Sequence, residues 1–329
     1  MSITITKAGI LDTIQDMGRY GYQHLGITPS GAMDRFAAQV ANILVGNETA
    51  EAVVEMHYPS PVIHFAAPAL VAISGAETVA YINNQPAPIL HPVMIGAGCD
   101  LTFRQPESGA RSYLAIKGGL DIPVWLNSYS TGRKAGMGGF KGRGLQKDDR
   151  IPFRQTNNYD RFLDGRDFLV LPWKADLQWE ESPINTVSVL PGHEWDWMDE
   201  ASQTMFETLP FYISSLSDRM GYRLNSVTLS FRHKEELISS AVSFGTIQLL
   251  PDGQAVVLMA GHQTTGGYPR IGHVATAHLP KLAQLKPGEE IYFELTDVAE
   301  AENLLTRQKQ HLQLLADACQ LRLQEYLRG

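Results

Sequence analysis

The run ALVAISGAE at residues 69–77 decides the fold, because a stretch of small and β-branched apolar residues interrupted by glycine is typical of a buried β-strand. It is echoed by AVVLMAGHQ at residues 255–263. PVMIGAGCDLTF at 92–103 is echoed in the same order by LAQLKPGEEIYF at 282–293. Two ordered matches predict two copies of one β-rich fold, although short β-rich strings also resemble one another by chance.

Strand patterns dominate the rest of the chain, and helix signals are confined to two places. At residues 34–45, Asp34 can cap the N-terminus of a helix and Gly46 can end it. The second helix is expected over about 297–328, with its leucines on one broad face that packs against the body of the protein or against a partner. These leucines are Leu305, Leu312, Leu315, Leu321 and Leu327. The sequence therefore predicts a mainly β protein with few helices and a long C-terminal one.

At 329 residues the chain reaches the length at which one core usually gives way to two. The polar, turn-rich stretch near residues 150–185 is the expected seam. We therefore predict an N-terminal β-barrel domain over 1–160, a second over 161–296 and the C-terminal helix over 297–329.

Composition excludes several classes of protein. The net charge of −8 and the absence of a long basic run argue against a nucleic-acid partner. No apolar stretch approaches the roughly 20 residues that span a bilayer, so no membrane partner is expected. The two cysteines form no disulfide framework, and the N-terminus has no secretory pattern, so a cytoplasmic location is expected.

The segment DMGRYGYQHLGITPSGAMD at 16–34 places glycines among chemically active side chains. Glycine lets the backbone approach a ligand, and an arginine can hold a planar anion through two parallel hydrogen bonds. The candidate ligand-binding residues here are Gln15, Asp16, Arg19, Ser30 and Asp34. The alternative interpretation is that Arg19 pairs with Asp16 and the glycines form turns.

The segment STGRKAGMGGFKGRGLQKDD at 130–149 is rich in glycine and basic residues. Its backbone amides could form an anion-binding nest, with Arg133 and Arg143 as candidate substrate-binding residues. It matches neither a P-loop nor a dinucleotide-binding turn. A solvated surface loop is the alternative.

A third candidate region combines SDRMGYRL at 217–224 with GHQTTGGYPR at 261–270. Their amide, hydroxyl and phenol groups could bind a flat amide or ureido ligand, with Tyr222 and Tyr268 covering its face. The other candidates are Asp218, Arg219, Gln263, Thr264, Thr265, Gly266, Gly267 and Arg270. A turn between strands explains TTGGYP equally well. No histidine or cysteine spacing indicates a metal site, and Cys99 is expected to be a small buried residue.

These three regions, in this order, resemble the allophanate hydrolase subunit 2 family, which includes the C subunit of 5-oxoprolinase, over about residues 3–295. The resemblance implies tandem cyclophilin-like β-barrels and a substrate site shared with an allophanate hydrolase subunit 1-like protein, the B subunit of 5-oxoprolinase. The A subunit is a further partner, and such complexes open 5-oxoproline to L-glutamate at the expense of ATP. The resemblance also implies that Arg19, Gln263, Thr264 and Thr265 act in catalysis. ATP is expected to bind with or through the partners, Mg²⁺ is a possible cofactor, and biotin is not expected.

The chain departs from this family's usual pattern at two places. Relatives usually have Asp-Arg where this chain has Gly261 and His262, and Glu-Gly where it has Ser240 and Ala241. A histidine would hold a substrate carboxylate more weakly than an arginine. Two alternatives therefore stay open, namely a regulatory protein that antagonises a kinase inhibitor and the carboxyltransferase half of a urea carboxylase-like enzyme.

Overall fold

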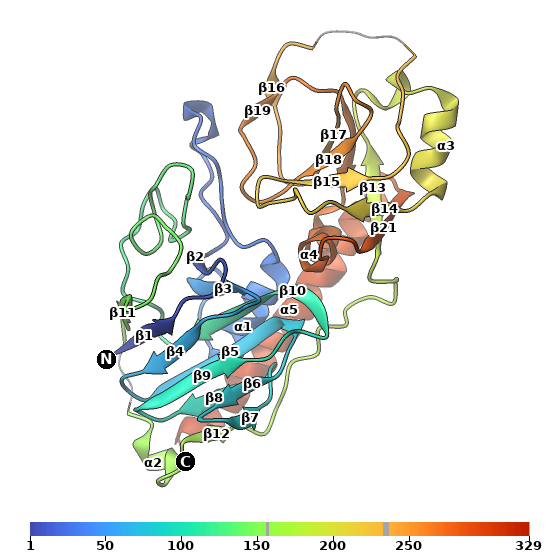
Figure 1. The fold of residues 1–329 in the computed structure, drawn as a ribbon. Coiled ribbons are helices and arrows are strands. Elements are labelled where there is room, and N and C mark those ends of the chain that lie inside the picture. Colours follow the sequence, from blue (N-terminus) through green and yellow to red (C-terminus); the bar gives the residue numbers. More distant parts are fainter. Residues whose placement is uncertain (156–157, 233–236, 329) are drawn as a thin grey trace. The chain divides into compact units, whose positions relative to one another are not determined.

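The computed structural model describes residues 1–155, 158–232 and 237–328. The chain divides into two compact units (Figure 1). The first contains Met1–Arg19, Asp34–Gln178 and Gln310–Gly329, and the second contains Tyr20–Met33 and Trp179–Lys309. The change of unit at Gln178 falls inside the seam expected from the sequence, whereas the short segment 20–33 joins the second unit and not the first.

The first unit is built on two six-stranded sheets, described here over the residues given above. One contains β1 (Ser2–Lys7), β4 (Val62–Phe65), β6 (Ala80–Ile82), β7 (Gln85–Ala87), β9 (Cys99–Phe103) and β11 (Arg150–Pro152), in the order β11-β1-β4-β9-β6-β7. The other contains β2 (Thr13–Gln15), β3 (Val53–His57), β5 (Ala69–Glu77), β8 (Pro92–Ile95), β10 (Ser108–Ile116) and β12 (Phe168–Val170), in the order β12-β8-β5-β10-β3-β2. Apolar side chains from both sheets share one core, which includes Ile5 and Phe65 from the first sheet and Val71 from the second.

Helix α1 (Arg35–Val45) begins and ends where the sequence predicts. The Asp34 side chain accepts a hydrogen bond from the Ala37 N–H at 2.8 Å, and Gly46 ends the helix with a φ of 69°. The helix packs on β5 and β10, where Ser74 donates to the Ala37 carbonyl at 2.5 Å. The short helix α2 (Asp160–Leu163) completes this unit.

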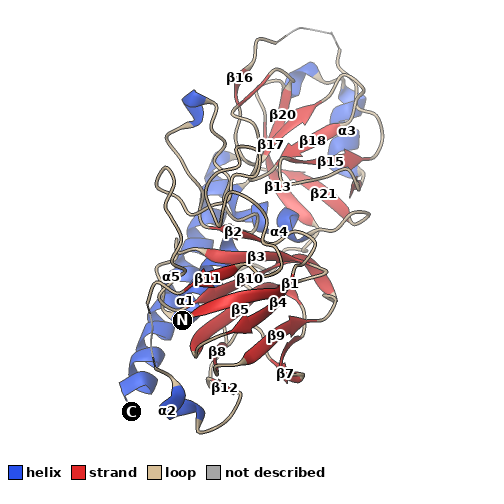
Figure 2. Cartoon of the chain, turned by 60° about the vertical axis from the view of Figure 1, so that its left-hand side comes forward, coloured by secondary structure: helices blue, strands red, loops and turns tan. Residues whose placement is uncertain are grey.

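The second unit is a closed barrel, most of whose strands are labelled in Figure 2. Its strands are β13 (Thr186–Pro191), β14 (Phe211–Ile213), β15 (Gly221–Asn225), β17 (Thr246–Leu249), β18 (Ala255–Leu258), β20 (Arg270–Val274) and β21 (Glu290–Leu295), in the order β13-β20-β17-β18-β15-β14-β21. A parallel pairing of β13 with β21 closes the ring. Phe206, Phe211 and Phe293 fill part of its core, and the rings of Phe206 and Phe293 stack at 4.8 Å.

Shorter elements surround the barrel. They are η1 (Gln23–Leu25), η2 (Trp195–Trp197), α3 (Glu200–Thr208), β16 (Ser240–Ala241), β19 (Thr265–Gly266), η3 (Thr276–His278) and α4 (Leu279–Gln284). Strands β16 and β19 pair with each other. The predicted turn TTGGYP therefore begins inside a small two-stranded sheet.

The long C-terminal helix is confirmed as α5 (Val298–Arg328). Of the leucines predicted on one face, Leu312 is buried within the chain, whereas Leu321 is 63% exposed. The buried side chains are Leu304, Gln308, Leu312, Cys319 and Leu323. Gln308 is buried because its Nε2 donates to the Ala277 carbonyl at 2.9 Å, a contact that leucine positions alone do not indicate.

The mainly β fold with few helices is confirmed. The proposed internal repeat agrees at 69–77 and 255–263, because β5 and β18 are both strands, and at Cys99–Phe103 and Glu290–Leu295, where β9 and β21 are both strands. The two copies differ between these points, since β8 is a strand where α4 is a helix. Superposition of the two units stays the test of duplication.

Candidate functional site

The first candidate region is the loop that follows β2, and Asp16 organises it. Its Oδ1 accepts hydrogen bonds from the Gly18 N–H at 2.7 Å and from the hydroxyls of Ser128 and Ser130, while Oδ2 accepts from the Tyr129 N–H at 2.6 Å. The Asp16 N–H in turn donates to the Ser130 hydroxyl at 3.0 Å. Asp16 therefore connects the loop to residues 128–130 through hydrogen bonds.

Arg19 is buried, with 1% of its surface exposed. Its Nη2 donates to the Ser130 carbonyl, and its guanidinium carbon lies 4.5 Å from the centre of the Trp125 ring. Its Nε and Nη1 have no hydrogen-bond partner among the described residues. Burial lowers the pKa of this guanidinium, and the nearby Asp16 carboxylate opposes that shift. The hydrogen bond of Arg19 thus goes to a backbone carbonyl, and two of its donor nitrogens remain available to a ligand.

Gln15 is the last residue of β2 and is fully buried. Its Nε2 donates to the Thr13 hydroxyl at 2.9 Å and points to the Thr131 carbonyl at 3.5 Å. Its Oε1 has no hydrogen-bond partner within the described part of the chain. Gln15 therefore presents a buried acceptor close to the segment that Arg19 contacts.

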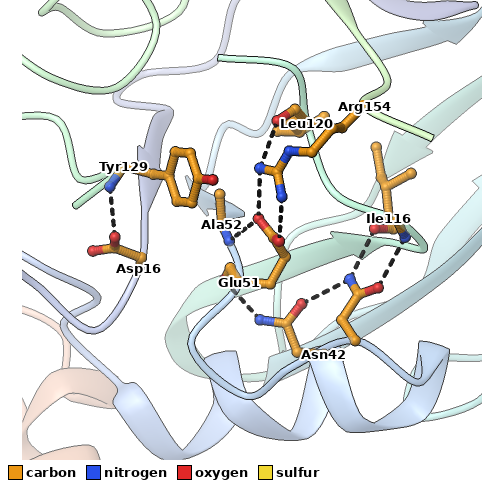
Figure 3. A network of polar contacts seen from close by, with 10 residues as sticks. Asp16, Asn42, Glu51, Ala52, Ile116, Leu120, Tyr129 and Arg154 are labelled. Atoms are coloured by element: carbon orange, nitrogen blue, oxygen red, sulfur yellow. Dashed lines mark hydrogen bonds and ion pairs between the residues drawn. The ribbon is translucent and has the colours of Figure 1, made fainter. Parts of the chain in front are cut away.

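A second network of polar contacts, around Glu51, connects this loop to helix α1 (Figure 3). The Arg154 guanidinium lies 4.9 Å from the centre of the Tyr129 ring and pairs with the Glu51 carboxylate through bonds of 2.8 and 3.2 Å. Asn42 of α1 donates to the Glu51 carbonyl at 2.8 Å. Because Tyr129 also donates to Asp16, the loop is tied to the rigid helix α1.

The glycine-rich segment 130–149 packs closely against Arg19. A Cβ atom at Gly138, whose φ is +70°, would lie 2.3 Å from the Ser130 carbonyl oxygen and 2.7 Å from Nη2 of Arg19. Only glycine fits such a position. Of the two predicted basic residues, Arg133 is exposed, whereas Arg143 pairs with both oxygens of Asp149 at 2.7 and 2.8 Å. That hydrogen-bonded pairing holds the pKa of Asp149 at about 2.

The third candidate region borders a recess of about 290 Å³ in the second unit. Three predicted residues line it, namely Asp218, Gln263 and Tyr268. Gln248 of β17 also lines it, with its Nε2 3.3 Å from the Tyr268 carbonyl and its Oε1 3.5 Å from Nε2 of Gln263. The remaining lining residues are mainly apolar: Leu216, Met220, Gly221, Arg223, Leu250, Val256 and Leu258. An apolar recess with two amide side chains suits a small polar ligand that carries its own amide.

Several predicted residues of this region have structural partners instead. Tyr222 is 2% exposed and belongs to the barrel core, so the expectation that it covers a ligand is corrected. Arg270 pairs with Glu194 at 2.7 Å and also donates to the Ser240 hydroxyl at 3.0 Å. Arg219 donates to the Gly31 carbonyl. These arginines join loops of the second unit to one another.

The remaining predicted residues lie around these contacts. Thr265 and Gly266 form β19, opposite Ala241 and Ser240, so the two unusual positions 240 and 241 face the predicted loop. Thr264 accepts a backbone hydrogen bond from Val242. Three predicted site residues remain. Gly267 follows β19, Ser30 is buried with a φ of 56°, and Asp34 caps the N-terminus of α1. None of these lines the recess described above.

Sequence reasoning missed Trp125, Ser128, Ser130 and Gln248. Ser128 lies two residues before the glycine-rich segment and Ser130 is its first residue, and that proximity was an available signal. Gln248 interrupts the apolar strand TIQLL, which is an unusual place for an amide unless it has a partner. Trp125 carried no sequence signal.

No group of three or more histidine, cysteine, aspartate or glutamate side chains in residues 1–155, 158–232 and 237–328 is arranged to hold a metal ion. In the same ranges, no helix has the length and apolar character needed to cross a bilayer.

Comparison with known proteins relates this architecture to enzymes. The chain is 35% identical to the C subunit of 5-oxoprolinase from Escherichia coli over 314 residues, covering 95% of this chain and 97% of that protein. It is 34% identical to the Haemophilus influenzae protein of the same name, covering 91% and 93% respectively. The structure matches 20% of the Kluyveromyces lactis urea amidolyase chain, with a TM-score of 0.86, 26% identity and 95% of this chain covered.

A family model described as carboxyltransferase domain, subdomain A and B, matches residues 25–295. The matched range includes the recess and the glycine-rich segment, and the two 5-oxoprolinase proteins extend the similarity to nearly the whole chain. The chain therefore belongs to the family of carboxyltransferase domains, subdomain A and B, together with the C subunits of 5-oxoprolinases.

Proposed function

We propose that this protein is a subunit of an ATP-dependent 5-oxoprolinase complex that opens 5-oxoproline to L-glutamate. Similarity over nearly the full length of two 5-oxoprolinase C subunits supports this function. We further propose that the chain acts with the A and B subunits of such a complex, in the cytoplasm, where its two free and buried cysteines would stay reduced.

The observation that carries the proposal is the buried guanidinium of Arg19. 5-Oxoproline has a carboxylate, and a buried arginine with unpaired donors is well suited to hold one. Asp16, Ser130 and Trp125 fix the position of this side chain before a ligand arrives. Such preorganisation lowers the entropic cost of binding. We therefore assign to this chain the part of the composite site that holds the substrate carboxylate.

Nucleotide chemistry is assigned to the partners. Opening an unstrained lactam with ATP requires phosphorylation of its amide oxygen, and Mg²⁺ usually accompanies the nucleotide. The described residues contain no group of three or more histidine, cysteine, aspartate or glutamate side chains arranged to hold a metal ion, and we derive no ATP-dependent step for this chain. Biotin has no role in this scheme.

The test compares Arg19→Lys with Arg19→Ala in a complex made by co-expression with the two partner proteins. A lysine keeps the charge but cannot form a planar, two-pronged contact. Both variants should therefore lower kcat/KM for ATP-dependent glutamate release by about 10- to 100-fold, the loss expected for one charge-assisted hydrogen bond. Full activity of Arg19→Lys would contradict the proposal.

A second candidate function is the carboxyltransferase half of a urea carboxylase-like enzyme. It is favoured by the TM-score of 0.86 to the urea amidolyase, of which this chain matches one fifth. Urea-dependent ATP hydrolysis by the same co-expressed complex, in the absence of glutamate release, would support this candidate over 5-oxoproline cleavage.

A further inference from the structure

Several buried polar atoms of the described residues lack a hydrogen-bond partner, and three of them belong to two side chains of the first unit. They are Nε and Nη1 of Arg19 and Oε1 of Gln15. Arg19 is 1% exposed and Gln15 is fully buried. A buried donor or acceptor left unpaired destabilises the folded protein, so a ligand that paired all three would gain affinity by removing that cost.

The two side chains converge on one segment of backbone. Nη2 of Arg19 donates to the carbonyl of Ser130, and Nε2 of Gln15 points to the carbonyl of Thr131. Consecutive Cα atoms lie only about 3.8 Å apart, so the two side chains contact neighbouring peptide groups of one segment. Asp16, between them in sequence, already accepts hydrogen bonds from Gly18, Ser128, Ser130 and Tyr129, and therefore leaves Arg19 available to a ligand.

The unpaired atoms define the chemistry of the ligand. Arg19 offers two donors and a positive charge, whereas Gln15 offers an acceptor, whose orientation is fixed because the amide nitrogen donates to Thr13. A simple carboxylate would leave Oε1 of Gln15 unpaired. We propose that Gln15 and Arg19 form one oxyanion site in which Gln15 selects ligands that carry an N–H or O–H group beside the anion.

5-Oxoproline has this pattern, since its lactam N–H is one carbon away from its carboxylate. In this form the inference rests on the proposed function, because that function supplies the ligand. Hydrogencarbonate is a second source of the same chemistry, with an O–H on the anion itself. Gln15 would then be a specificity-determining residue, and Arg19 the residue that holds the charge.

The test titrates the purified full-length chain by calorimetry and by tryptophan fluorescence. The ligands are 5-oxoproline, N-methyl-5-oxoproline, which lacks the donor, 2-pyrrolidinone, which lacks the carboxylate, and hydrogencarbonate. We expect the parent to bind 5-oxoproline at least tenfold more tightly than its N-methyl form. Because Trp125 contacts Arg19, Trp125→Phe should remove most of the fluorescence change.

Variants separate the two roles. Gln15→Met should bind 5-oxoproline and its N-methyl form equally, because the acceptor is gone, while Arg19→Gln should bind neither. Gly138→Ala should abolish binding, since its Cβ would overlap the Ser130 carbonyl and crowd Arg19. Gly136→Ala is the matched control, because Gly136 also has a positive φ, 62°, but its Cβ would meet nothing within 4 Å. Melting temperatures check that each variant folds.

Equal affinity of the parent for 5-oxoproline and its N-methyl form would overturn the inference. Failure of all four ligands to bind would also overturn it, because water alone would then fill the site. Binding of hydrogencarbonate in place of 5-oxoproline, with the same loss in Gln15→Met, would support the site and contradict the proposed function. Conversely, a co-expressed complex that releases glutamate but discriminates N-methylation equally with and without Gln15→Met would support the function and overturn the inference.

Discussion

Asp12 makes the stability of the first unit depend on pH. It lies directly before β2, is 1% exposed, and has a carboxylate oxygen that accepts a hydrogen bond from the Gly9 N–H at 2.7 Å. Burial raises its pKa from 3.8 to about 7, and the backbone groups of Gly9 and His57 only partly oppose that shift. The folded protein therefore binds a proton between about pH 4 and pH 7 that the unfolded chain has released.

The sign and size of the effect follow from this difference. A raised acid pKa contributes stability that is fully present below the unfolded pKa and is lost as the pH rises through the folded one. One pKa unit corresponds to about 1.4 kcal/mol, so a rise from 3.8 to about 7 corresponds to about 4 kcal/mol. An uncharged asparagine of the same shape removes this dependence.

We therefore predict that Asp12→Asn gains stability relative to the parent as the pH rises from about 4 to 8, by up to about 4 kcal/mol. The assay is urea denaturation of both proteins across that range, because groups common to both cancel in the difference. Asp148→Asn, at an exposed residue with a φ of 70° that asparagine tolerates, is the control. A difference that does not change with pH would refute the reasoning.

The other predictions concern the second unit. Glu194→Gln should destabilise the protein by about 3 kcal/mol in urea denaturation. Glu194 is 1% exposed and pairs with Arg270 at 2.7 Å, so the substitution leaves a half-buried arginine without its carboxylate partner. An unchanged midpoint would contradict this. Replacing Gln263 and Thr265 together by alanine should preserve co-purification with the partner proteins while lowering glutamate release by at least tenfold, because Gln263 lines the recess. Unchanged release with intact partner binding would instead favour the regulatory alternative.

The sequence predicted the ends of a helix where residues close in the chain determine them. Helix α1 begins at Asp34 and ends at Gly46 because a cap and a left-handed glycine act within one turn. The buried face of α5 was less predictable. Leu321 is 63% exposed and Gln308 is buried, since tertiary contacts and not residue type select the face.

In the candidate site, too, local features were predictable from the sequence and long-range contacts were not. Sequence reasoning identified Gln15, Asp16 and Arg19 as polar residues in a glycine-rich loop, but Arg19's partner, Ser130, lies 111 residues away, and no pattern in the sequence relates the two. Tyr222 was misassigned although a signal existed. The alternation Gly-Tyr-Arg-Leu in β15 turns Tyr222 and Leu224 to one face, and both are buried in the barrel core.

The central claim is that this chain is an essential but incomplete part of a 5-oxoprolinase. The most direct measurement is ATP-dependent release of glutamate from 5-oxoproline by the chain alone, by the two partner proteins alone, and by all three after co-expression. We expect glutamate only from the three together and only with ATP. Release by the isolated chain, or equal release by the two partners without it, would contradict the account.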